Sequence, residues 1–434
     1  MYGSVDFILK NIYGHYYFLL LEKRNGRIFM GNSFFSILPV YYCQIKDKIV
    51  ISESALRLGR QTGKQKISKR YVLESLLFNY PLFNSTIFEE IQLLPVNTNL
   101  MISGDKVYLQ KHTKIEDYFI RKPFSRKRSI RIITDKFIET VNKYFPSEHF
   151  MCTLTGGFDG RTITSAGKYL NKPFSTYSFG EESSKDIQIA QEVAQVAGIR
   201  YFKIPLDYSY IEKHSINNGR EFIINSSGLA TFTRAHYLYA TKILSEKTKY
   251  ILTGNFGSEI FRAVHIPGVF ISANLYNLFA TEKPDEGIKK IETSSEFRYL
   301  PLQIFREDWE ALKCDLVNLP CYKNQLPGFS RNEKFYVFVF EEVFRKYFGA
   351  ELVNQFYYLK NRTPFLDIDF LSAILSTRYA GVYSRYFEHN PLNRYKGQVL
   401  YASIINNTFP LLGDIKTDKG YKPNDLMSLF GKAA

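Results

Sequence analysis

The chain has 434 residues, of which 45% are apolar and 23% charged, and its net charge at pH 7 is +15. This composition is typical of a globular protein of two or three domains and excludes a disordered or collagen-like chain. No run of about 18 apolar residues occurs, so we expect no transmembrane helix and no membrane partner.

The positive charge alone is compatible with nucleic-acid binding, but no continuous basic stripe or RNA-binding signature accompanies it. The chain is also rich in Lys, Ile, Asn, Tyr and Phe together, as an AT-rich genome would produce, and we do not expect a nucleic-acid partner. The cysteines are scattered, at Cys43, Cys152, Cys314 and Cys321. Without a C-x-x-C pair they predict neither a zinc site nor a disulfide framework, and we expect a reducing, cytoplasmic location.

The first part of the chain, to about residue 118, consists mostly of short β-prone runs separated by turn residues. The runs are Tyr16–Leu21, Arg27–Gly31, Val40–Ile45 and Lys48–Ser52. Their close spacing predicts antiparallel hairpins. A helix is expected near Ser68 to Leu77, with Ser68 as its N-cap, and a last hairpin should turn at Ser103-Gly104-Asp105.

After a basic linker, strands and helices alternate. The predicted strands are Phe150–Leu154, Phe174–Phe179, Tyr201–Pro205 and Tyr250–Leu252. Ser129 is expected to cap a helix that continues to Tyr144, and Ser183 or Ser184 a later helix that ends at Gly198. The alternation predicts parallel βαβ units with helices on both faces of the sheet. Residues from about 270 onward are predicted to be mostly helical.

The segment after the first of these strands is Thr155-Gly156-Gly157-Phe158-Asp159-Gly160-Arg161. Two adjacent glycines let the backbone approach a ligand, and successive N–H groups at a helix N-terminus favour an anion. Thr155 can donate a hydroxyl hydrogen bond, Asp159 can hold a divalent cation beside phosphates, and Arg161 can neutralise charge. The segment is not a Walker loop, because the Gly-Lys-Ser/Thr ending is missing. A plain turn with a helix-capping aspartate is the alternative.

This segment resembles the pyrophosphate loop of the N-type ATP pyrophosphatases, Ser-Gly-Gly-x-Asp-Ser, with Thr155 and Gly160 at the two serine positions. Leu252 to Arg262 resembles the Ser-Gly-(Glu/Asp)-Gly-x-Asp-Glu-(Leu/Ile/Val)-Phe segment of the asparagine synthetase family. Asn361 to Asp367 is close to that family's Val-Arg-x-Pro-Phe-Leu-Asp. Three matches in the family's order, across about 210 residues, are more specific than any one of them.

The N-terminal part resembles the glutaminase domain of the same family. The matching segments are Asn32 to Tyr42 followed by Ile51-Ser52-Glu53, and Ile91 to Asn97. Members with amidotransferase activity begin, after removal of Met, with a nucleophilic cysteine whose own amine activates it. Tyr2 stands at that position here, so we expect no glutamine hydrolysis and a domain that serves as a scaffold.

The resemblance implies two domains and an α/β fold class. Residues 1–120 would form a degenerate glutaminase-like domain of the Ntn-hydrolase type, rich in antiparallel strands. Residues 121–434 would form a parallel-sheet ATP pyrophosphatase domain with a helical C-terminal part.

The resemblance also implies ATP and Mg²⁺ as cofactors. The expected nucleotide-binding residues are Thr155, Gly156, Gly157, Asp159, Gly160, Arg161, Ser178, Thr253 and Gly254. The family's second magnesium-holding aspartate falls on Ser258, and its acid after Ser-Gly falls on Asn255. We therefore expect Asp159 and the neighbouring Glu259 to hold the metal. Asp186, near a helix N-terminus, is another candidate acid, with compensation of the helix dipole as the alternative.

Ile415 to Tyr421 stands where the family places a lysine that contacts the ATP phosphates and the transition state. Lys419 is the first choice for this lysine and Lys416 the second. With Glu259, they complete the expected catalytic residues. A charged, solvated tail is the alternative.

The resemblance implies an ATP-dependent, AMP-forming ligase that adenylates a carboxylate, releases pyrophosphate and lets an amine attack. Divergent relatives such as β-lactam synthetases and lasso-peptide cyclases close a ring in this way. The resemblance implies small-molecule or peptide substrates and partner proteins of a natural-product pathway. A non-catalytic nucleotide-binding or assembly protein is the alternative, favoured by Ser258 and Asn255. A tRNA-modifying pyrophosphatase fits the charge but not the N-terminal match.

Overall fold

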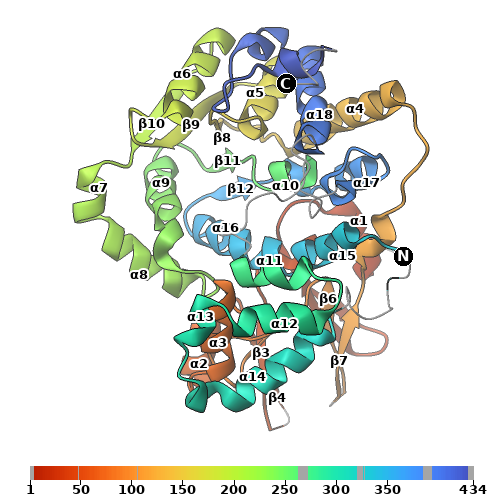
Figure 1. Cartoon of the computed structure of the whole chain (residues 1–434), viewed down its shortest axis with the longest axis vertical. Helices are drawn as coiled ribbons and strands as arrows, with labels where there is room; N and C mark the ends of the chain where they lie inside the picture. The colour runs from red at the N-terminus through yellow and green to blue at the C-terminus, as the bar shows by residue number, and fades with distance from the viewer. Residues whose placement is uncertain are drawn as a thin grey trace. The chain divides into compact units, whose positions relative to one another are not determined.

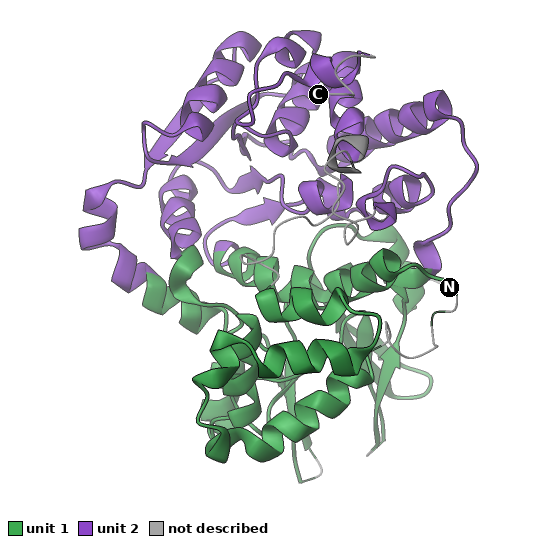
Figure 2. Ribbon diagram, viewed as in Figure 1, with its two compact units in different colours: residues 1–116, 219–234, 266–354 green, residues 117–218, 235–265, 355–434 purple. Residues whose placement is uncertain are grey.

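The computed structural model describes residues 4–46, 48–104, 106–261, 272–319, 326, 328–384 and 393–428. Tyr2, Asp105, Arg262 and Cys321, which enter the predictions above, lie outside these residues. The chain forms two compact units (Figure 2). Unit 1 comprises residues 1–116, 219–234 and 266–354, and unit 2 comprises residues 117–218, 235–265 and 355–434. The domain division at residue 120 stays a prediction, since two later segments group with the N-terminal residues in unit 1.

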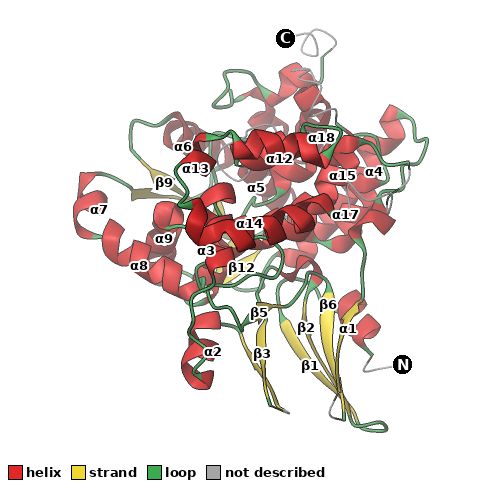
Figure 3. Cartoon of the chain, turned by 60° about the horizontal axis from the view of Figure 1, so that its bottom comes forward, coloured by secondary structure: helices red, strands yellow, loops and turns green. Residues whose placement is uncertain are grey.

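Unit 1 contains two antiparallel sheets (Figure 3). The strand order is β1-β2-β6-β7 in one sheet and β4-β3-β5 in the other. The strands are β1 (Tyr17–Glu22), β2 (Arg27–Asn32), β3 (Tyr41–Ile45), β4 (Lys48–Ser52), β5 (Gln92–Leu93), β6 (Thr98–Ser103) and β7 (Lys106–Lys111). The pairings of β1 with β2, β3 with β4 and β6 with β7 confirm the predicted hairpins.

The two faces of the four-stranded sheet differ. One face packs against the three-stranded sheet around Val40, Leu94 and Leu100. Because successive side chains of a strand point to opposite faces of the sheet, the other face carries the remaining side chains of these strands. Its central row is Leu20, Phe29, Met101 and Tyr108, which are partners in adjacent strands.

Helices form the rest of unit 1 (Figure 1). They are α1 (Val5–Asn11), α2 (Ala55–Thr62), α3 (Lys69–Phe78), most of α8 (Ser215–Asn225), α11 (Ala273–Phe279), α12 (Pro284–Glu292), α13 (Ser295–Arg298), α14 (Leu302–Val317), α15 (Arg331–Phe338), a π-helix (Val339–Phe348) and most of α16 (Gly349–Phe356). The helical character predicted after residue 270 is confirmed. The N-cap at Ser68 is also confirmed, because its hydroxyl accepts the N–H of Tyr71.

Unit 2 is built on a five-stranded sheet with the order β10-β9-β8-β11-β12, in which every pairing is parallel. The strands are β8 (Phe150–Thr153), β9 (Phe174–Gly180), β10 (Tyr201–Pro205), β11 (Tyr250–Leu252) and β12 (Lys360–Arg362). The first four agree with the predicted strands. The fifth was not predicted as a strand, because its sequence Lys-Asn-Arg has no β-prone pattern.

Helices cover both faces of this sheet, as predicted. The helices of unit 2 include α4 (Arg126–Tyr144), α5 (Asp159–Tyr169), α6 (Lys185–Ala197), α7 (Tyr208–Lys213), α9 (Ala235–Ser245), α10 (Gly257–Phe261), α17 (Ile368–Leu375) and α18 (Asn393–Thr408). On one face, Ala240 and Leu244 of α9 pack against Met151 and Ile251. On the other face α5 approaches closely, since a methyl group at Gly167 would lie 2.6 Å from the ring of Phe174.

The predicted start of α4 at Ser129 was wrong. The helix begins at Arg126, where the hydroxyl of Ser125 accepts the N–H of Arg128 at 3.3 Å. Apolar periodicity begins one turn later than the helix, because the first turn is basic. The cap of α6 is Ser184, the second of the two predicted residues, and the helix ends at Gly198 with φ of 61°. Within the described residues, no helix is long and apolar enough to cross a bilayer.

Candidate functional site

The two glycine-containing motifs of unit 2 follow neighbouring strands. β8 lies between β9 and β11, so the chain turns in opposite directions from it. Open α/β sheets bind ligands at such a switch point, outside the carboxyl ends of the strands. The loop after β8 leads into α5, and the loop after β11 leads into α10. The topology therefore brings the first and second sequence motifs to one edge of the sheet.

These two loops meet over Asp159. A methyl group at Gly254 would lie 2.6 Å from Cβ of Asp159, and one at Gly257 would lie 2.6 Å from its Oδ1. Both distances are too short for a real side chain. Glycine at these two positions therefore lets the second loop approach the carboxylate of the first.

The Asp159 carboxylate accepts hydrogen bonds from two hydroxyl groups. Ser258 Oγ donates to Oδ2 at 2.8 Å, and the Tyr401 hydroxyl donates to Oδ1. Tyr401 comes from α18, and its ring stacks on Phe158 and Phe261 with centroids 5.4 and 4.1 Å apart. Sequence reasoning missed Tyr401, because it lies 242 residues from Asp159 in a helix without a recognisable motif.

The backbone of the first loop faces oxygen atoms. The N–H of Gly156 donates to Asp186 Oδ1 at 2.9 Å, and the N–H of Gly157 donates to Thr155 Oγ1 at 3.3 Å. The carbonyl of Gly156 accepts the N–H of Asp418 at 3.2 Å. Asp186 thus contacts the loop itself, while Ser184 caps its helix. A carboxylate oxygen of Asp186 therefore already accepts a hydrogen bond from the Gly156 N–H of this loop.

Arg161 points into the protein. Its side chain is 0% exposed, and its guanidinium donates to the carbonyls of four residues. The acceptors are Gly156 (3.5 Å), Leu412 (3.2 Å), Ile415 (2.6 Å) and Lys416 (3.0 Å). Burial lowers the pKa of Arg161 to about 10, so the side chain is still charged at pH 7. The structure therefore places this charge under the loop, where it fixes the C-terminal segment 412–416.

Both candidate lysines are exposed and belong to this C-terminal segment. Lys419 Nζ lies 2.7 Å from Asp418 Oδ2, in an ion pair with the preceding residue. A turn joins Thr417 to Tyr421, whose carbonyl accepts the Thr417 N–H at 2.8 Å. Arg161 donates to the carbonyl of Lys416, and the carbonyl of Gly156 accepts the N–H of Asp418. These two hydrogen bonds place the segment with both lysines next to the first loop.

Three further predicted residues support the loops from inside. Ser178 donates to the carbonyl of Leu154, and Thr253 Oγ1 donates to Asn361 Oδ1 at 3.2 Å. A side chain at Gly160 would lie 2.3 Å from the carbonyl oxygen of Thr153, which explains glycine where the related motif has serine. Glu259 and Asn255 are half-buried in and before α10.

The ligand atoms around Asp159 suit magnesium better than zinc. Asp159, Ser258 and Tyr401 offer oxygen atoms, which hard cations prefer. Among the described residues, no group of three or more His, Cys, Asp or Glu side chains could hold a metal ion. Mg²⁺ usually keeps several waters and takes one or two carboxylates plus phosphate oxygens. A site with few carboxylates is compatible with that coordination.

Part of this chain is similar to an asparagine synthetase. The relative is asparagine synthetase (glutamine-hydrolyzing) 1 of Bacillus subtilis (strain 168), which is 22% identical over 189 residues. The match covers 43% of this chain and 30% of the relative, so it spans less than a third of the relative's length. This similarity supports a distant relationship to the asparagine synthetases.

Two other comparisons add little to that similarity. No protein-family model matches the chain. The solved structure of NMN synthetase from Francisella tularensis matches with a TM-score of 0.23 and 17% identity, over 32% of this chain and 58% of that one. A TM-score this low carries no argument about fold or function.

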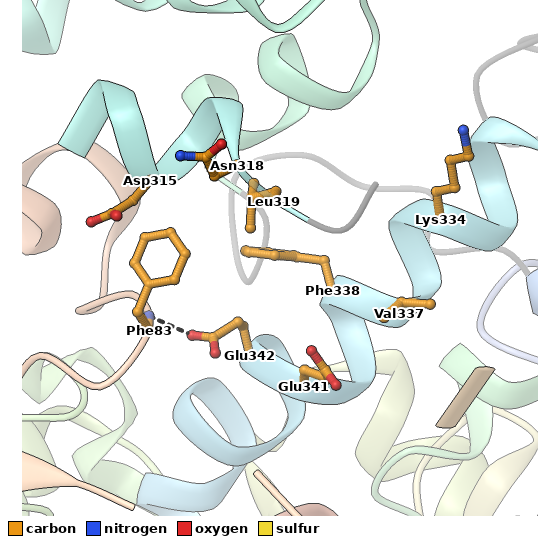
Figure 4. Close-up of a pocket in the computed structure, with 9 residues that line it drawn as sticks. All are labelled: Phe83, Asp315, Asn318, Leu319, Lys334, Val337, Phe338, Glu341 and Glu342. Carbon is orange, nitrogen blue, oxygen red and sulfur yellow. Dashed lines mark hydrogen bonds between the residues drawn. The ribbon is translucent and has the colours of Figure 1, made fainter. Parts of the chain in front are cut away.

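Unit 1 contains a cavity of about 270 Å³ between α14, α15 and the π-helix (Figure 4). Three carboxylates line it, those of Asp315, Glu341 and Glu342. Asp315 pairs with Arg70 at 2.8 Å, and Glu341 pairs with Lys111 at 2.5 Å. The third carboxylate is the most buried and belongs to a larger network.

Glu342 is neutralised by two cations on its own π-helix. Its oxygens accept from Arg345 at 3.1 Å and Lys346 at 2.5 Å, and from the N–H of Phe83 at 2.8 Å. The carbonyl of Phe83 accepts from the same two cations. These bonds hold Phe83 in the left-handed region, with φ of 52°. Burial lowers the pKa of Lys346 to about 8. The charges of this cavity are thus compensated within unit 1, and the network explains them structurally.

Proposed function

We propose that the protein is an ATP-dependent, AMP-forming carbon–nitrogen ligase. In this reaction a substrate carboxylate attacks the α-phosphate of ATP and displaces pyrophosphate, and an amine then attacks the acyl carbon and displaces AMP. The observation that carries the proposal is the meeting of the two glycine loops over Asp159 at the switch point of the parallel sheet. The similarity to an asparagine synthetase over part of the chain supports the same reaction class.

The loop after β8 is the proposed phosphate site. The N–H groups of Gly156 and Gly157 already donate to oxygen acceptors, and the adjacent start of α5 adds the positive end of a helix dipole. In the proposal, phosphate oxygens take over these donors, and Asp186 Oδ1 gives up the Gly156 N–H. Thr155 would then offer its hydroxyl to a phosphate oxygen.

Asp159 and Glu259 would hold Mg²⁺ in this proposal. The metal would supply positive charge that offsets the negative charge of the departing pyrophosphate. Ser258 and Tyr401 would orient the Asp159 carboxylate, since each donates to one of its two oxygens. Lys419, or Lys416 as the second choice, would contact the phosphates from the C-terminal turn. Arg161 would position that turn from below.

The proposed substrates are a small-molecule or peptide carboxylate and an amine. Intramolecular ring closure, as in β-lactam synthetases and lasso-peptide cyclases, is one version of the reaction, and amide decoration of a sugar or peptide is another. The amine would come from a substrate or from free ammonia, without hydrolysis of glutamine.

A non-catalytic nucleotide-binding protein is the second candidate. Ser258 favours it, because this residue brings a hydroxyl to Asp159 where the related motif has a second aspartate. ATP binding without pyrophosphate release would then be expected for every substrate.

The test combines ATP binding with an isotope experiment. The protein, ATP and MgCl₂ are incubated with a panel of carboxylate–amine pairs, including peptides that carry both groups, and pyrophosphate release is measured. Carboxylates labelled with ¹⁸O should transfer one label to AMP, because the attacking oxygen stays with the phosphate. Absence of ATP binding would contradict both candidates, whereas binding without release across the panel would favour the second.

A further inference from the structure

The four-stranded sheet of unit 1 has a hollow on the face that does not pack against the other sheet. Its volume is about 1160 Å³, and its lining includes residues of β1, β2, β6, β7 and α1. Figure 3 shows α1 beside these strands. The apolar floor is the row Leu20, Phe29, Met101 and Tyr108. This hollow lies entirely within unit 1, so it is independent of the proposed ligase site.

Asn99 gives the hollow a buried acceptor that needs a partner. The residue is 1% exposed, and its Oδ1 accepts no hydrogen bond from the described part of the chain. The oxygen lies over Gly31 on the adjacent strand, 2.4 Å from where a methyl group at that residue would be. Glycine at residue 31 therefore makes the space that the amide occupies. Native proteins leave few buried polar atoms unsatisfied, so the atom points to an absent donor.

His112 adds a second polar group at the same end. Its Nδ1 lies 2.9 Å from the hydroxyl of Thr113, while its buried Nε2 has no hydrogen-bond partner within the described residues. Burial lowers the pKa of His112 to about 4, so the ring is neutral at pH 7 and has one donor and one acceptor nitrogen. The side chain of Asn99 likewise offers an acceptor and a donor. Together they match the N–H and C=O of a peptide unit.

The opposite end of the hollow is basic. The β1–β2 turn brings Lys23, Arg24 and Arg27 to the lining, against the carboxylate of Glu22, which pairs with Arg27 at 2.7 Å. The other charged residues of the lining, Asp6 and Lys111, belong to α1 and β7. Arg27 is four residues from Gly31 along β2, or about 13 Å at the usual rise of a strand. An extended peptide covers this distance with about four residues.

We infer that the hollow binds an extended peptide segment that carries an acidic side chain. One peptide unit pairs with Asn99 and His112, apolar side chains cover the Leu20–Tyr108 row, and a carboxylate about four residues away meets the basic turn. The basic residues of the β1–β2 turn favour a peptide with an acidic side chain. The unsatisfied Oδ1 of Asn99 favours a ligand with a backbone N–H over a purely apolar one. The inference goes beyond the proposed ligase function and does not depend on it.

The probe is a set of six fluorescein-labelled hexapeptides of alternating Ala and Leu, each with one Glu at a different position. Binding to the full-length protein is measured by fluorescence polarisation. We expect at least one peptide to bind saturably. Its Glu→Gln version should bind about tenfold more weakly because it loses the charge pairing, and added KCl should weaken the Glu peptide selectively. Methylation of its backbone nitrogens should also weaken binding about tenfold, because the donor to Asn99 is removed.

Protein variants locate the binding site. Asn99→Leu and Gly31→Ala should each weaken binding about tenfold, and Lys23→Gln/Arg24→Gln should abolish the preference for Glu over Gln. The matched control is Lys48→Gln/Lys69→Gln, which removes two exposed charges of unit 1 outside the hollow and should leave the affinity unchanged. Circular dichroism checks that each variant is folded.

Three results would overturn the inference. The first is the absence of saturable binding by all six peptides. The second is binding that responds neither to backbone methylation nor to the Asn99 and Gly31 variants. The third is saturation by a fluorescent fatty acid but by no peptide. The methylated peptide acts on the unmodified protein, so the test stands even if a variant fails to fold.

Discussion

Asp159 in unit 2 and Glu342 in unit 1 are both carboxylates that accept hydrogen bonds from side chains, but the donors that the structure describes differ in kind. Glu342 is paired with Arg345 and Lys346, whose charges offset its own. The hydroxyls of Ser258 and Tyr401, which are neutral groups, donate hydrogen bonds to the two oxygens of Asp159. A buried ion network of the first kind holds structure together, whereas the second kind suits a group whose charge is used on a ligand. The two carboxylates should therefore respond differently to the same substitution.

The largest expected effect is on the stability of unit 1. Glu342→Gln should lower the free energy of unfolding by about 3–5 kcal/mol, because it leaves two buried cations without their carboxylate. Urea denaturation followed by fluorescence would measure this. Glu341→Gln is the matched control on the adjacent residue, and its loss should be smaller since only Lys111 is left unpaired. Equal losses in both variants would remove the special role of Glu342.

Asp159→Asn should show the reverse pattern. We expect pyrophosphate release to fall by at least about 100-fold, while the free energy of unfolding changes by less than about 1 kcal/mol. Glu259→Gln should also be severe. Asp207→Asn is the control, because Asp207 is an exposed N-cap of unit 2 and Asn caps equally well. If Asp159→Asn released pyrophosphate at a near-normal rate with an active substrate pair, Asp159 would not be the residue that holds the metal.

Arg161 is a buried charged residue of unit 2, and we expect it to stabilise the fold as Glu342 does in unit 1. Arg161→Met should lower stability by about 2–3 kcal/mol, because four carbonyls lose a buried cationic donor. Limited proteolysis should then cut within residues 412–421 faster than in the unmodified protein. Arg161→Lys should recover part of the protection. Unchanged proteolysis in Arg161→Met would show that the segment is held by other contacts.

Acid should weaken unit 1 through two buried histidines. Burial lowers the pKa of both His15 and His112 to about 4 in the folded state, from an ordinary value of 6.5. Between pH 6.5 and 4 the unfolded chain binds protons that the folded chain does not, so stability falls as the pH falls. The expected loss is on the order of 2 kcal/mol per histidine.

Hydrogen exchange by unit at pH 7 and pH 5 would measure this acid effect. His15→Gln/His112→Gln should flatten the pH dependence of unit 1 alone. An unchanged pH dependence of unit 1 in the double variant would contradict the assignment.

The smallest effect concerns the metal. Ser258→Asp would add a carboxylate beside Asp159, and we expect the Mg²⁺ concentration for half-maximal pyrophosphate release to fall by about two- to tenfold. Titration with MgCl₂ at fixed ATP would show the shift. A higher Mg²⁺ requirement would mean that Ser258 is needed as a donor to Asp159 rather than as a missing ligand.

The sequence predicted the local parts of this structure well. Hairpins such as β3–β4 and the strands β8–β11 have strong β-prone runs next to turn residues. β12 was missed, because three polar residues become a strand only through pairing with β11. The cap of α4 was predicted at Ser129 and lies at Ser125, because apolar periodicity begins one turn after the start of the helix.

The candidate site was predictable as motifs but not as an arrangement. The glycines and Asp159 stand out in the sequence, since their spacing has a chemical meaning. The contact of Tyr401 with Asp159 depends on tertiary packing across 242 residues, and nothing near either residue indicates it. The burial of Arg161 is likewise a property of the C-terminal segment that covers it.

Because both units are built from separate segments of the chain, neither can be completed early in synthesis. Strands β10, β9, β8 and β11 of the parallel sheet are complete once residue 252 is made, but β12 comes only at residues 360–362. Between them the ribosome makes residues 266–354, which belong to unit 1. During that interval the outer edge of β11 has no strand partner, and unit 1 still lacks its last helices. We therefore expect nascent chains stalled before residue 360 to bind chaperones and to aggregate, and those that expose residue 362 beyond the exit tunnel to become protease-resistant.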